Sequence, residues 1–162
     1  HVDDAGRSAS EYDFDSFVFT RPVVLRLTKG ESEMVAAEEL EEHASEIREA
    51  DLLLIKTGFQ DRREKDPAAY MNRNPGMSAA AAEYLATFPR LRALGFDFIS
   101  LSAVQNREEG RKAHRALLKG RDFFIVEDMD LARVPKGLKR VFVVPLFIEG
   151  IDSVPCTVVG EA

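Results

Sequence analysis

Short, nearly continuous hydrophobic runs alternate with amphipathic stretches through the middle of the chain. The run at residues 51–56 (DLLLIK) has too few polar positions to leave one strand face in water, which is typical of a strand buried on both faces. Within residues 35–50, Leu40, Ala44 and Ile47 recur at helical spacing with acidic residues between them, which predicts one amphipathic helix. Within 17–27, with a proline at its centre, the pattern predicts either two short strands or one strand that begins at Pro22. The same reasoning predicts strands at 96–101, 123–126, 140–148 and 154–159, and helices at 79–88 and 108–118.

This alternation of helices with short apolar strands predicts an α/β fold, a single domain with a central mixed sheet flanked by helices. The segment 58–76 interrupts the pattern, because it is polar and ends in the turn signature Asn74-Pro75-Gly76. We expect a long loop there, and long loops in compact domains are usually functional or mobile. Ser78 then caps the next helix, and Pro89 closes it.

Composition excludes several classes of protein. The chain has 162 residues with 22 basic and 28 acidic side chains, so its formal charge is −6. This balance argues against a nucleic-acid partner, because a phosphate backbone requires clustered Lys and Arg. The apolar runs are far shorter than the ~20 residues of a membrane helix, so we expect no membrane span. With Cys156 as the only cysteine and an acidic start unlike a secretory signal, we expect a cytoplasmic protein.

Candidate chemistry rests on three histidines, because the sequence has no P-loop, dinucleotide-binding glycine motif, nucleophile elbow or cysteine pair. We interpret His43, which lies among glutamates, as a solvated surface side chain. His1 and Asp3 differ, because a His-x-Asp spacing on an extended segment directs both side chains to the same face. An imidazole and a carboxylate there are suitable ligands for a divalent metal, and the alternative is a disordered terminus.

His114 and Glu127 form a second candidate pair. His114 lies on the helix predicted at 108–118, and Glu127 directly follows the strand predicted at 123–126. The carboxyl ends of sheet strands are where α/β folds place ligands. The alternative is that Glu127 only ends its strand, as acidic residues commonly do.

Several segments, in their order and spacing, resemble one family. They are DLLLIKTGF (51–59), Tyr70 with NPGMSAAAAEYLA (74–86), AHRALLKGRDFFIVEDMDLARVP (113–135) and VPLFIEGIDSVPCTVV (144–159). The sequence thereby resembles the metal-dependent cyclase-like hydrolases that include bacterial kynurenine formamidase and isatin hydrolase. The resemblance implies a swivelling β/β/α arrangement over the domain 1–162 and a homo-oligomer, either a dimer or a tetramer.

The metal signature of this family is His-x-Gly-Thr-His-x-Asp-x-Pro-x-His, with a His and a Glu far downstream. His1 matches its central His and Asp3 its Asp. His114 and Glu127 match the downstream pair. The resemblance implies that these four residues hold a divalent metal, Zn or Mn, which activates water to attack an amide carbonyl of a small-molecule substrate. Glu127 is the expected catalytic proton acceptor, since a carboxylate can share its oxygens between a metal and a water.

The sequence departs from the family pattern in three ways. Nothing precedes His1, so we expect the start of the motif and the N-terminal strands of the family to be absent. Arg7 stands where the motif ends in His, the proton carrier of the family; a guanidinium stays protonated, so we expect Arg7 to point outward or to bind a substrate carboxylate. Where the family has Gly-Ile-Asp-x-x-Ser, we align Ser102 with the Asp and Gln105 with the Ser, which removes polar support from the site.

Two hypotheses result. The first is a metal-dependent hydrolase of a small-molecule amide, in which Arg7, Phe59 and Tyr70 contact the substrate. The second is a catalytically inactive member of the family that binds a small molecule or a protein partner, and it is favoured by Arg7, Ser102 and Gln105. The metal content of the protein discriminates between them.

Overall fold

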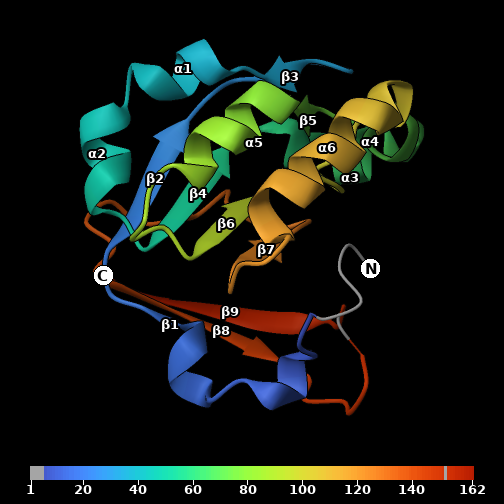
Figure 1. Ribbon diagram of the computed structural model, residues 1–162. Helices are drawn as coiled ribbons and strands as arrows, with labels where there is room; N and C mark the ends of the chain where they lie inside the picture. Colours follow the sequence, from blue (N-terminus) through green and yellow to red (C-terminus); the bar gives the residue numbers. More distant parts are fainter. Residues whose placement is uncertain (1–5, 152) are drawn as a thin grey trace.

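The computed structural model describes residues 6–151 and 153–162 of the chain. Its elements form three layers: an antiparallel sheet, a parallel sheet and a set of helices (Figure 1). One hydrophobic cluster lies between the helices and the parallel sheet, and a second lies between the two sheets. The predicted α/β fold class is therefore confirmed, with parallel and antiparallel strands divided between separate sheets.

The central layer is a parallel sheet in the order β2-β4-β6-β7. Its strands are β2 (Pro22–Arg26), β4 (Leu52–Lys56), β6 (Ala93–Phe96) and β7 (Phe124–Val126). In β4, Leu53 and Ile55 enter the cluster under the helices, whereas Leu52 and Leu54 enter the cluster between the sheets. The strand is thus buried on both faces, as its continuous apolar run predicts.

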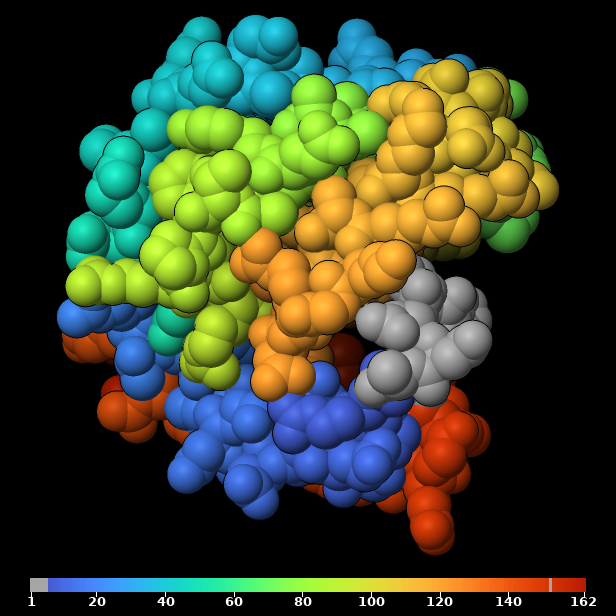
Figure 2. All heavy atoms as spheres, viewed as in Figure 1, coloured from blue at the N-terminus to red at the C-terminus, as the bar shows by residue number. Residues whose placement is uncertain are grey.

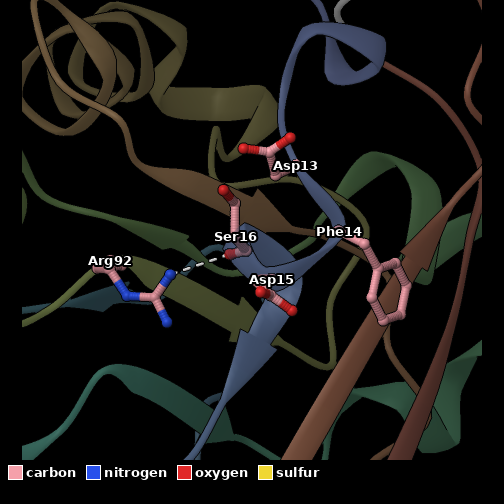
Figure 3. Close-up of a pocket in the computed structure, with 5 residues that line it drawn as sticks. All are labelled: Asp13, Phe14, Asp15, Ser16 and Arg92. Atoms are coloured by element: carbon pink, nitrogen blue, oxygen red, sulfur yellow. Dashed lines mark hydrogen bonds between the residues drawn. The ribbon is translucent and has the colours of Figure 1, made fainter.

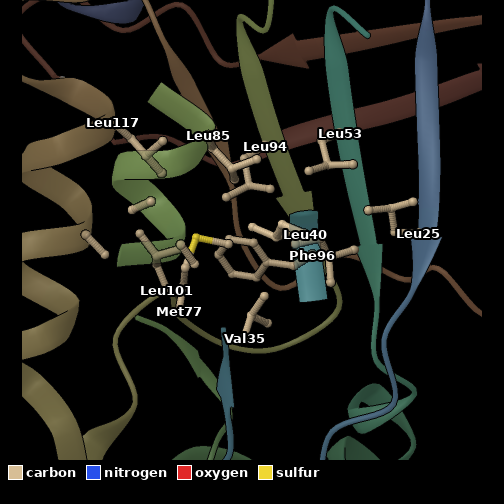
Figure 4. Close-up of a cluster of buried hydrophobic side chains, with 14 of the residues drawn as sticks. Leu25, Val35, Leu40, Leu53, Met77, Leu85, Leu94, Phe96, Leu101 and Leu117 are labelled. Atoms are coloured by element: carbon tan, nitrogen blue, oxygen red, sulfur yellow. The ribbon is translucent and has the colours of Figure 1, made fainter. Parts of the chain in front are cut away.

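The outer layer consists of helices, most of them short. They are α1 (Ala37–Glu41), α2 (Ala44–Glu49), α3 (Arg62–Lys65), α4 (Pro67–Asn72), α5 (Ala79–Ala86) and α6 (Arg107–Leu118), with 3-10 turns η1 (Ala9–Glu11), η2 (Phe14–Phe17), η3 (Phe59–Asp61) and η4 (Val104–Asn106). In the core, Leu85 of α5 and Leu117 of α6 meet Leu25, Leu53 and Leu94 of the parallel strands (Figure 4). This burial holds the helical layer on the sheet, since each fully buried leucine contributes about 1.5–3 kcal/mol.

Two of the predicted helical and loop segments differ from the structure. The single helix predicted at 35–50 is two helices, because the N–H of His43 bonds to the carbonyl of Leu40 at 3.0 Å and this tight turn ends α1. Each short helix still buries one large side chain, Leu40 and Ile47.

The second difference lies in the segment 58–76, where the prediction of a long loop is wrong. Asp66 caps α4 by accepting the N–H of Ala69 at 3.0 Å, and Pro67 occupies the first helical turn. Tyr70 of α4 is buried in the core. The segment is polar overall, but the Asp66 cap and the buried ring of Tyr70 are enough to stabilise the helix. A prediction from composition therefore missed it.

The third layer is an antiparallel sheet in the order β1-β8-β9. Its strands are β1 (Val18–Phe19), β8 (Arg140–Pro145) and β9 (Cys156–Glu161), and a small parallel pair, β3 (Met34–Val35) and β5 (Gly76–Met77), lies apart from it. In Figure 2 the N-terminal segment, in blue, and the C-terminal strands, in red, form the lower part of the molecule. The predicted segment 17–27 holds the two short strands β1 and β2, and β8 is shorter than the predicted 140–148, whereas the strand predicted at 154–159 lies at 156–161.

Arg92 fastens this layer to the central sheet. Its guanidinium donates to the carbonyls of Ser16 at 3.0 Å and Val18 at 2.9 Å, and lies 4.8 Å from the ring centre of Phe19. A shallow hollow of about 580 Å³ opens beside it, where Asp13, Phe14 and Asp15 also line the surface (Figure 3). Within residues 6–151 and 153–162, no helix has the length and apolar character needed to cross a membrane.

Candidate functional site

Polar residues follow three neighbouring strands at the carboxyl edge of the parallel sheet. Thr57 comes after β4, Asp97 after β6 and Glu127 after β7. Ligands bind at this edge in open α/β sheets. β6 ends at Phe96, so the strand predicted at 96–101 is misplaced, and residues 97–101 instead form a loop along the edge.

The structure brings His114 and Glu127 together at this edge. Nε2 of His114, on α6, lies 3.7 Å from Oε1 of Glu127. The other ring nitrogen, Nδ1, lies 2.8 Å from the carbonyl oxygen of Gly110, so Nδ1 carries a hydrogen. Nε2 therefore faces Glu127, where it holds a proton or, when deprotonated, offers a lone pair. The two side chains are 25% and 36% exposed, so both are accessible to solvent.

The loop after β6 orients the Glu127 carboxylate. The backbone N–H of Leu101 donates to Oε1 at 2.8 Å, and the hydroxyl of Ser100 lies 3.3 Å from the same oxygen. These contacts use the oxygen that also faces His114. The carboxylate thus has a fixed direction while it remains open to solvent.

The charge of Glu127 acts on His114. Contact with this carboxylate raises the pKa of His114 above its ordinary value, and the Gly110 carbonyl adds to the shift, whereas burial of the ring opposes it. A proton on Nε2 is therefore favoured, and a metal that binds there must displace it.

Asp97 fixes the base of the same edge. Its carboxylate is fully buried and accepts the N–H of Thr57 at 2.8 Å, the hydroxyl of Thr57 at 2.6 Å and the N–H of Gly58 at 2.8 Å. Gly58 has a φ of 82°, a backbone conformation that favours glycine. These bonds tie the end of β4 to the end of β6 and draw the chain out of the sheet into the loop that carries Ser100.

The expected loss of polar support at Ser102 and Gln105 is therefore wrong. Gln105 donates to the carbonyl of Asn72 at 2.6 Å, and Ser102 packs so closely on α6 that a Cβ at position 110 would lie 2.0 Å from its hydroxyl. The polar support comes from Asp97 and Ser100, which fit the Gly-x-Asp-x-x-Ser spacing starting at Gly95. The sequence held this signal, but the assignment of 96–101 to a strand obscured it.

Arg7 makes its contacts with Asp122 and Tyr12. Its Nη2 is 2.7 Å from Oδ1 of Asp122, and its guanidinium lies 3.9 Å from the ring centre of Tyr12. The hydroxyl of Tyr12 donates to the same carboxylate oxygen at 3.0 Å. The arginine is thus held by an ion pair and an aromatic face.

Phe59 and Tyr70, the aromatic residues expected to contact substrate, are each only 3% exposed. Their rings stack with centroids 5.9 Å apart inside the core under the helices. Only the polar end of Tyr70 reaches toward the site, because its hydroxyl donates to Asp128, the neighbour of Glu127. The structure thus gives both rings a packing role.

A cleft of about 410 Å³ adjoins Glu127, between the segment after β7 and the β8–β9 strands. Its walls are mainly apolar, and its polar residues include Glu127, Asp130 and Arg133. The apolar walls are formed by Leu54, Val126, Met129, Leu131, Val134, Pro135, Leu138, Val141 and Val158. Such a mixture of apolar walls with few polar groups suits a small organic molecule.

The donor chemistry of the pair suits a divalent cation, since an imidazole nitrogen beside a carboxylate oxygen is a donor set that Zn and Mn accept. In the part of the chain that the structure describes, no group of three or more His, Cys, Asp or Glu side chains gathers as a metal site. His1 and Asp3, the other two predicted ligands, lie outside the described residues. Among the described residues the pair therefore offers two donor side chains, fewer than a complete protein metal site uses.

A comparison with known protein families shows a match over more than half of the chain. The model of the family described as "Putative cyclase" matches residues 1–103. The chain belongs to this cyclase family. The matched range includes Asp97 and Ser100, whereas His114 and Glu127 lie beyond it. The resemblance predicted from the sequence is confirmed.

Curated relatives extend the similarity along the chain. An "Uncharacterized protein" of Haemophilus influenzae is 31% identical over 94 residues, which is 57% of this chain and 66% of the relative. "Cyclase-like protein 1" of Arabidopsis thaliana is 25% identical over 162 residues, covering 96% of this chain and 62% of that protein. The chain thus spans less than two thirds of the length of these relatives.

Solved structures share the fold of this chain. Isatin hydrolase A from Labrenzia aggregata, bound to benzyl benzoate, superposes with a TM-score of 0.78 at 22% identity, covering 96% of this chain and 66% of that one. A potential metal-dependent hydrolase with cyclase activity gives a TM-score of 0.72 at 22% identity, covering 98% and 72% of the two chains. At these identities the likeness concerns the fold alone.

Proposed function

We propose that this chain is part of a metal-dependent hydrolase of a small-molecule amide, in which His114 and Glu127 bind a divalent cation, Zn or Mn. One observation carries the proposal: Nε2 of His114 and Oε1 of Glu127 lie 3.7 Å apart, with the His114 ring held through Nδ1 and the Glu127 carboxylate held through Oε1 itself. A donor pair oriented in advance loses little entropy on binding a cation. The names of the structural neighbours, a potential metal-dependent hydrolase and isatin hydrolase, support the same reaction class.

His1 and Asp3 complete the proposed ligand set, on the strength of the sequence motif. A divalent cation bound by these residues would lower the pKa of a water and polarise the amide carbonyl. Overall, the water oxygen bonds to the carbonyl carbon, the carbon–nitrogen bond breaks, and a proton reaches the leaving nitrogen.

The residues of this chain supply orientation and proton transfer. Leu101 and Ser100 hold Oε1 of Glu127, so this carboxylate has a fixed position from which to accept a proton from water and return it to the leaving nitrogen. Arg7 stands at the position of the family's proton carrier and stays protonated beside Asp122. Glu127 is therefore the residue that we assign as proton carrier.

Calorimetric titration of the purified protein with Zn²⁺ and Mn²⁺ tests the cation site. We expect the wild-type protein to bind one of these ions, and Glu127→Gln and His114→Gln to lose that binding while remaining folded. His43→Gln is the matched control, since His43 also contacts a glutamate, Glu46, at 2.9 Å on the protein surface. Hydrolysis of isatin and N-formylkynurenine, followed in the same variants, tests the substrate class. Unchanged binding in both site variants contradicts the proposal.

The second candidate is a catalytically inactive family member that binds a small molecule or a protein partner. The engagement of Arg7 by Asp122 and Tyr12 favours it, because no proton carrier then occupies this position. The apolar cleft beside Glu127 would accommodate the small molecule. A folded wild-type protein that binds neither ion and hydrolyses neither amide supports this candidate.

We also propose a homo-oligomer, a dimer or tetramer, in the cytoplasm. Large apolar side chains are exposed around the connection between β8 and β9: Leu146, Phe147, Ile148 and Ile151. Exposed apolar patches of this kind are commonly covered by a neighbouring chain. Light scattering at micromolar concentrations tests the assembly, and a monomer throughout contradicts it. Cell fractionation tests the compartment.

A further inference from the structure

The residue after Glu127 has an uncommon backbone conformation. Asp128 has a φ of 58°, in the left-handed region that few residues other than glycine adopt. Its N–H donates to the carbonyl of Phe98 at 2.9 Å, and the N–H of Met129 donates to the carbonyl of Phe96 at 2.9 Å. The turn after β7 is thus bonded to the chain that leaves β6. Such conformations persist where several contacts act together to hold them.

Two side chains hold the Asp128 carboxylate from the other side. The buried hydroxyl of Tyr70 donates to its Oδ1. Nη2 of Arg63, on α3, lies 2.7 Å from the same oxygen and 3.1 Å from the Asp128 carbonyl. The same nitrogen lies 3.1 Å from the Tyr70 hydroxyl and 3.3 Å from the carbonyl of Met129. One guanidinium group therefore touches the side chain and the backbone of the turn together.

Packing and protonation keep Tyr70 and Arg63 as fixed hydrogen-bond donors. The ring of Tyr70 stacks on Phe59 in the core, which fixes the direction of its hydroxyl. Burial, together with the hydrogen bond to Asp128, raises the pKa of Tyr70, so the hydroxyl remains a donor through the ordinary pH range. Arg63 remains protonated at any ordinary pH. Nε of Arg63 is buried without a hydrogen-bond partner among the described residues, so the contacts of Nη2 determine where this side chain lies.

We propose that Tyr70 and Arg63 clamp Asp128 and thereby aim the Glu127 carboxylate at His114. Val126 is paired with Gly95 in the sheet, and Glu127 and Asp128 share one planar peptide. An anchor on Asp128 therefore fixes the second of the two peptides that flank the Glu127 Cα, and with it the direction in which the side chain leaves the backbone. Tyr70, Arg63 and Asp128 are therefore positioning residues. The inference rests on the proposed function in so far as Glu127 is a metal ligand, but the aim of its carboxylate is a property of the metal-free protein.

Hydrogen exchange in the metal-free protein measures this aim directly. The Leu101 N–H is protected by its bond to Oε1 of Glu127, so its exchange rate reports whether Glu127 stays in place. We expect Tyr70→Phe, which keeps the stacked ring, to speed Leu101 exchange about tenfold, the loss of one hydrogen bond. Tyr84→Phe is the matched control, because Tyr84 lies on α5 and packs on Phe88, away from the cluster. The amide of Leu53, inside β4, reports global unfolding.

Substitutions of Asp128 separate its charge and shape from its backbone. We expect Asp128→Ala to speed Leu101 exchange more than Tyr70→Phe does, and Asp128→Asn, which keeps an acceptor oxygen, to restore much of the protection. Arg63→Gln should resemble Tyr70→Phe, with Arg63→Lys less affected. Should Asp128→Ala fail to fold, the Tyr70 and Arg63 variants carry the test.

Zn²⁺ affinity gives the second measurement. We expect Tyr70→Phe to weaken it about tenfold, as loss of a group that orients a ligand typically does. The proposal is overturned if Leu101 exchange stays within about twofold of wild type in Tyr70→Phe and Arg63→Gln, or if Leu53 exchange rises as much as that of Leu101. A wild-type protein that binds no ion defeats the proposed function alone, since the exchange experiment still tests the clamp.

Discussion

The molecule contains two histidine–glutamate contacts in very different settings. In the corner between α1 and α2, Nδ1 of His43 lies 2.9 Å from Oε1 of Glu46, three residues further along. At the carboxyl edge of the parallel sheet, Nε2 of His114 lies 3.7 Å from Oε1 of Glu127, which belongs to a different element. The closer pair is the local one, and its glutamate is 55% exposed.

The difference lies in what surrounds each pair. His114 is held through Nδ1 by the Gly110 carbonyl, and Glu127 is held by Leu101 and Ser100. The contact of His43 with Glu46 is a neighbour-to-neighbour contact on the surface, of a kind that contributes little to stability. Orientation by the surroundings, rather than a short distance, therefore marks the pair suited to bind a cation.

The largest expected difference between the two pairs appears when one carboxylate is removed from each. Glu127→Gln should weaken Zn²⁺ or Mn²⁺ binding by more than the ~10–100-fold that loss of an orienting group costs, and abolish amide hydrolysis, because a ligand charge disappears. Glu46→Gln should change neither. Calorimetric titration and an assay with isatin measure both effects. Equal behaviour of the two variants contradicts the assignment.

A second test removes the buried support of the site. Asp97→Ala should destabilise the protein by about 3 kcal/mol, because it leaves the buried donors of Thr57 and Gly58 unpaired. It should also weaken metal binding, since the loop that orients Glu127 loosens. Thermal and denaturant unfolding measure the first effect.

The comparator for that test is Asp51, which accepts the N–H groups of Thr20 at 2.8 Å and Arg21 at 2.9 Å at the opposite end of β4. Asp51→Ala should destabilise the protein but leave the metal affinity of the folded state unchanged. If both variants lower metal affinity equally, the effect of Asp97 is one of general stability.

The pH dependence of the His114–Glu127 pair gives a third test. Contact with Glu127 raises the pKa of folded His114, so the charged pair adds stability below the ordinary histidine pKa of about 6.5, and this contribution is lost as pH rises through the folded pKa. Metal affinity should show the opposite trend and fall as pH falls through that pKa, because a proton competes for Nε2. NMR titration of the His114 ring, in wild type and in Glu127→Gln, measures the shift; an unchanged pKa in the variant excludes Glu127 as its cause.

The smallest expected effect concerns Ser100. Its hydroxyl lies 3.3 Å from Oε1 of Glu127, a longer contact than the 2.8 Å bond from the Leu101 N–H. Ser100→Ala should therefore weaken metal binding by roughly tenfold or less. Ser102→Ala, at the position aligned from the sequence with the Asp of the motif, should leave binding unchanged. A larger effect at Ser102 than at Ser100 would contradict the assignment of Ser100 to the motif.

Much of this fold could be predicted from the sequence, because hydrophobic patterns indicate which residues are buried. The apolar run of β4 predicted a strand buried on both faces, and the cap at Ser78 predicted where α5 begins, with its hydroxyl accepting the N–H of Ala81 at 3.1 Å. The family motif singled out His114 and Glu127 before their contact was known. The helices within 58–76 escaped prediction, because a cap at Asp66 and one buried ring, that of Tyr70, outweigh a polar composition.

The sequence by itself determined the alternation of strands and helices and the membership of the cyclase family, because local periodicity and ordered motifs are properties of the chain. Only the tertiary structure decided which groups surround Glu127. The donors at Leu101 and Ser100 follow from strand order, which places the loop after β6 beside the end of β7. Tyr70 was expected to contact substrate. In the structure its ring is packed in the core, and only its hydroxyl reaches the edge of the sheet, where it donates to Asp128.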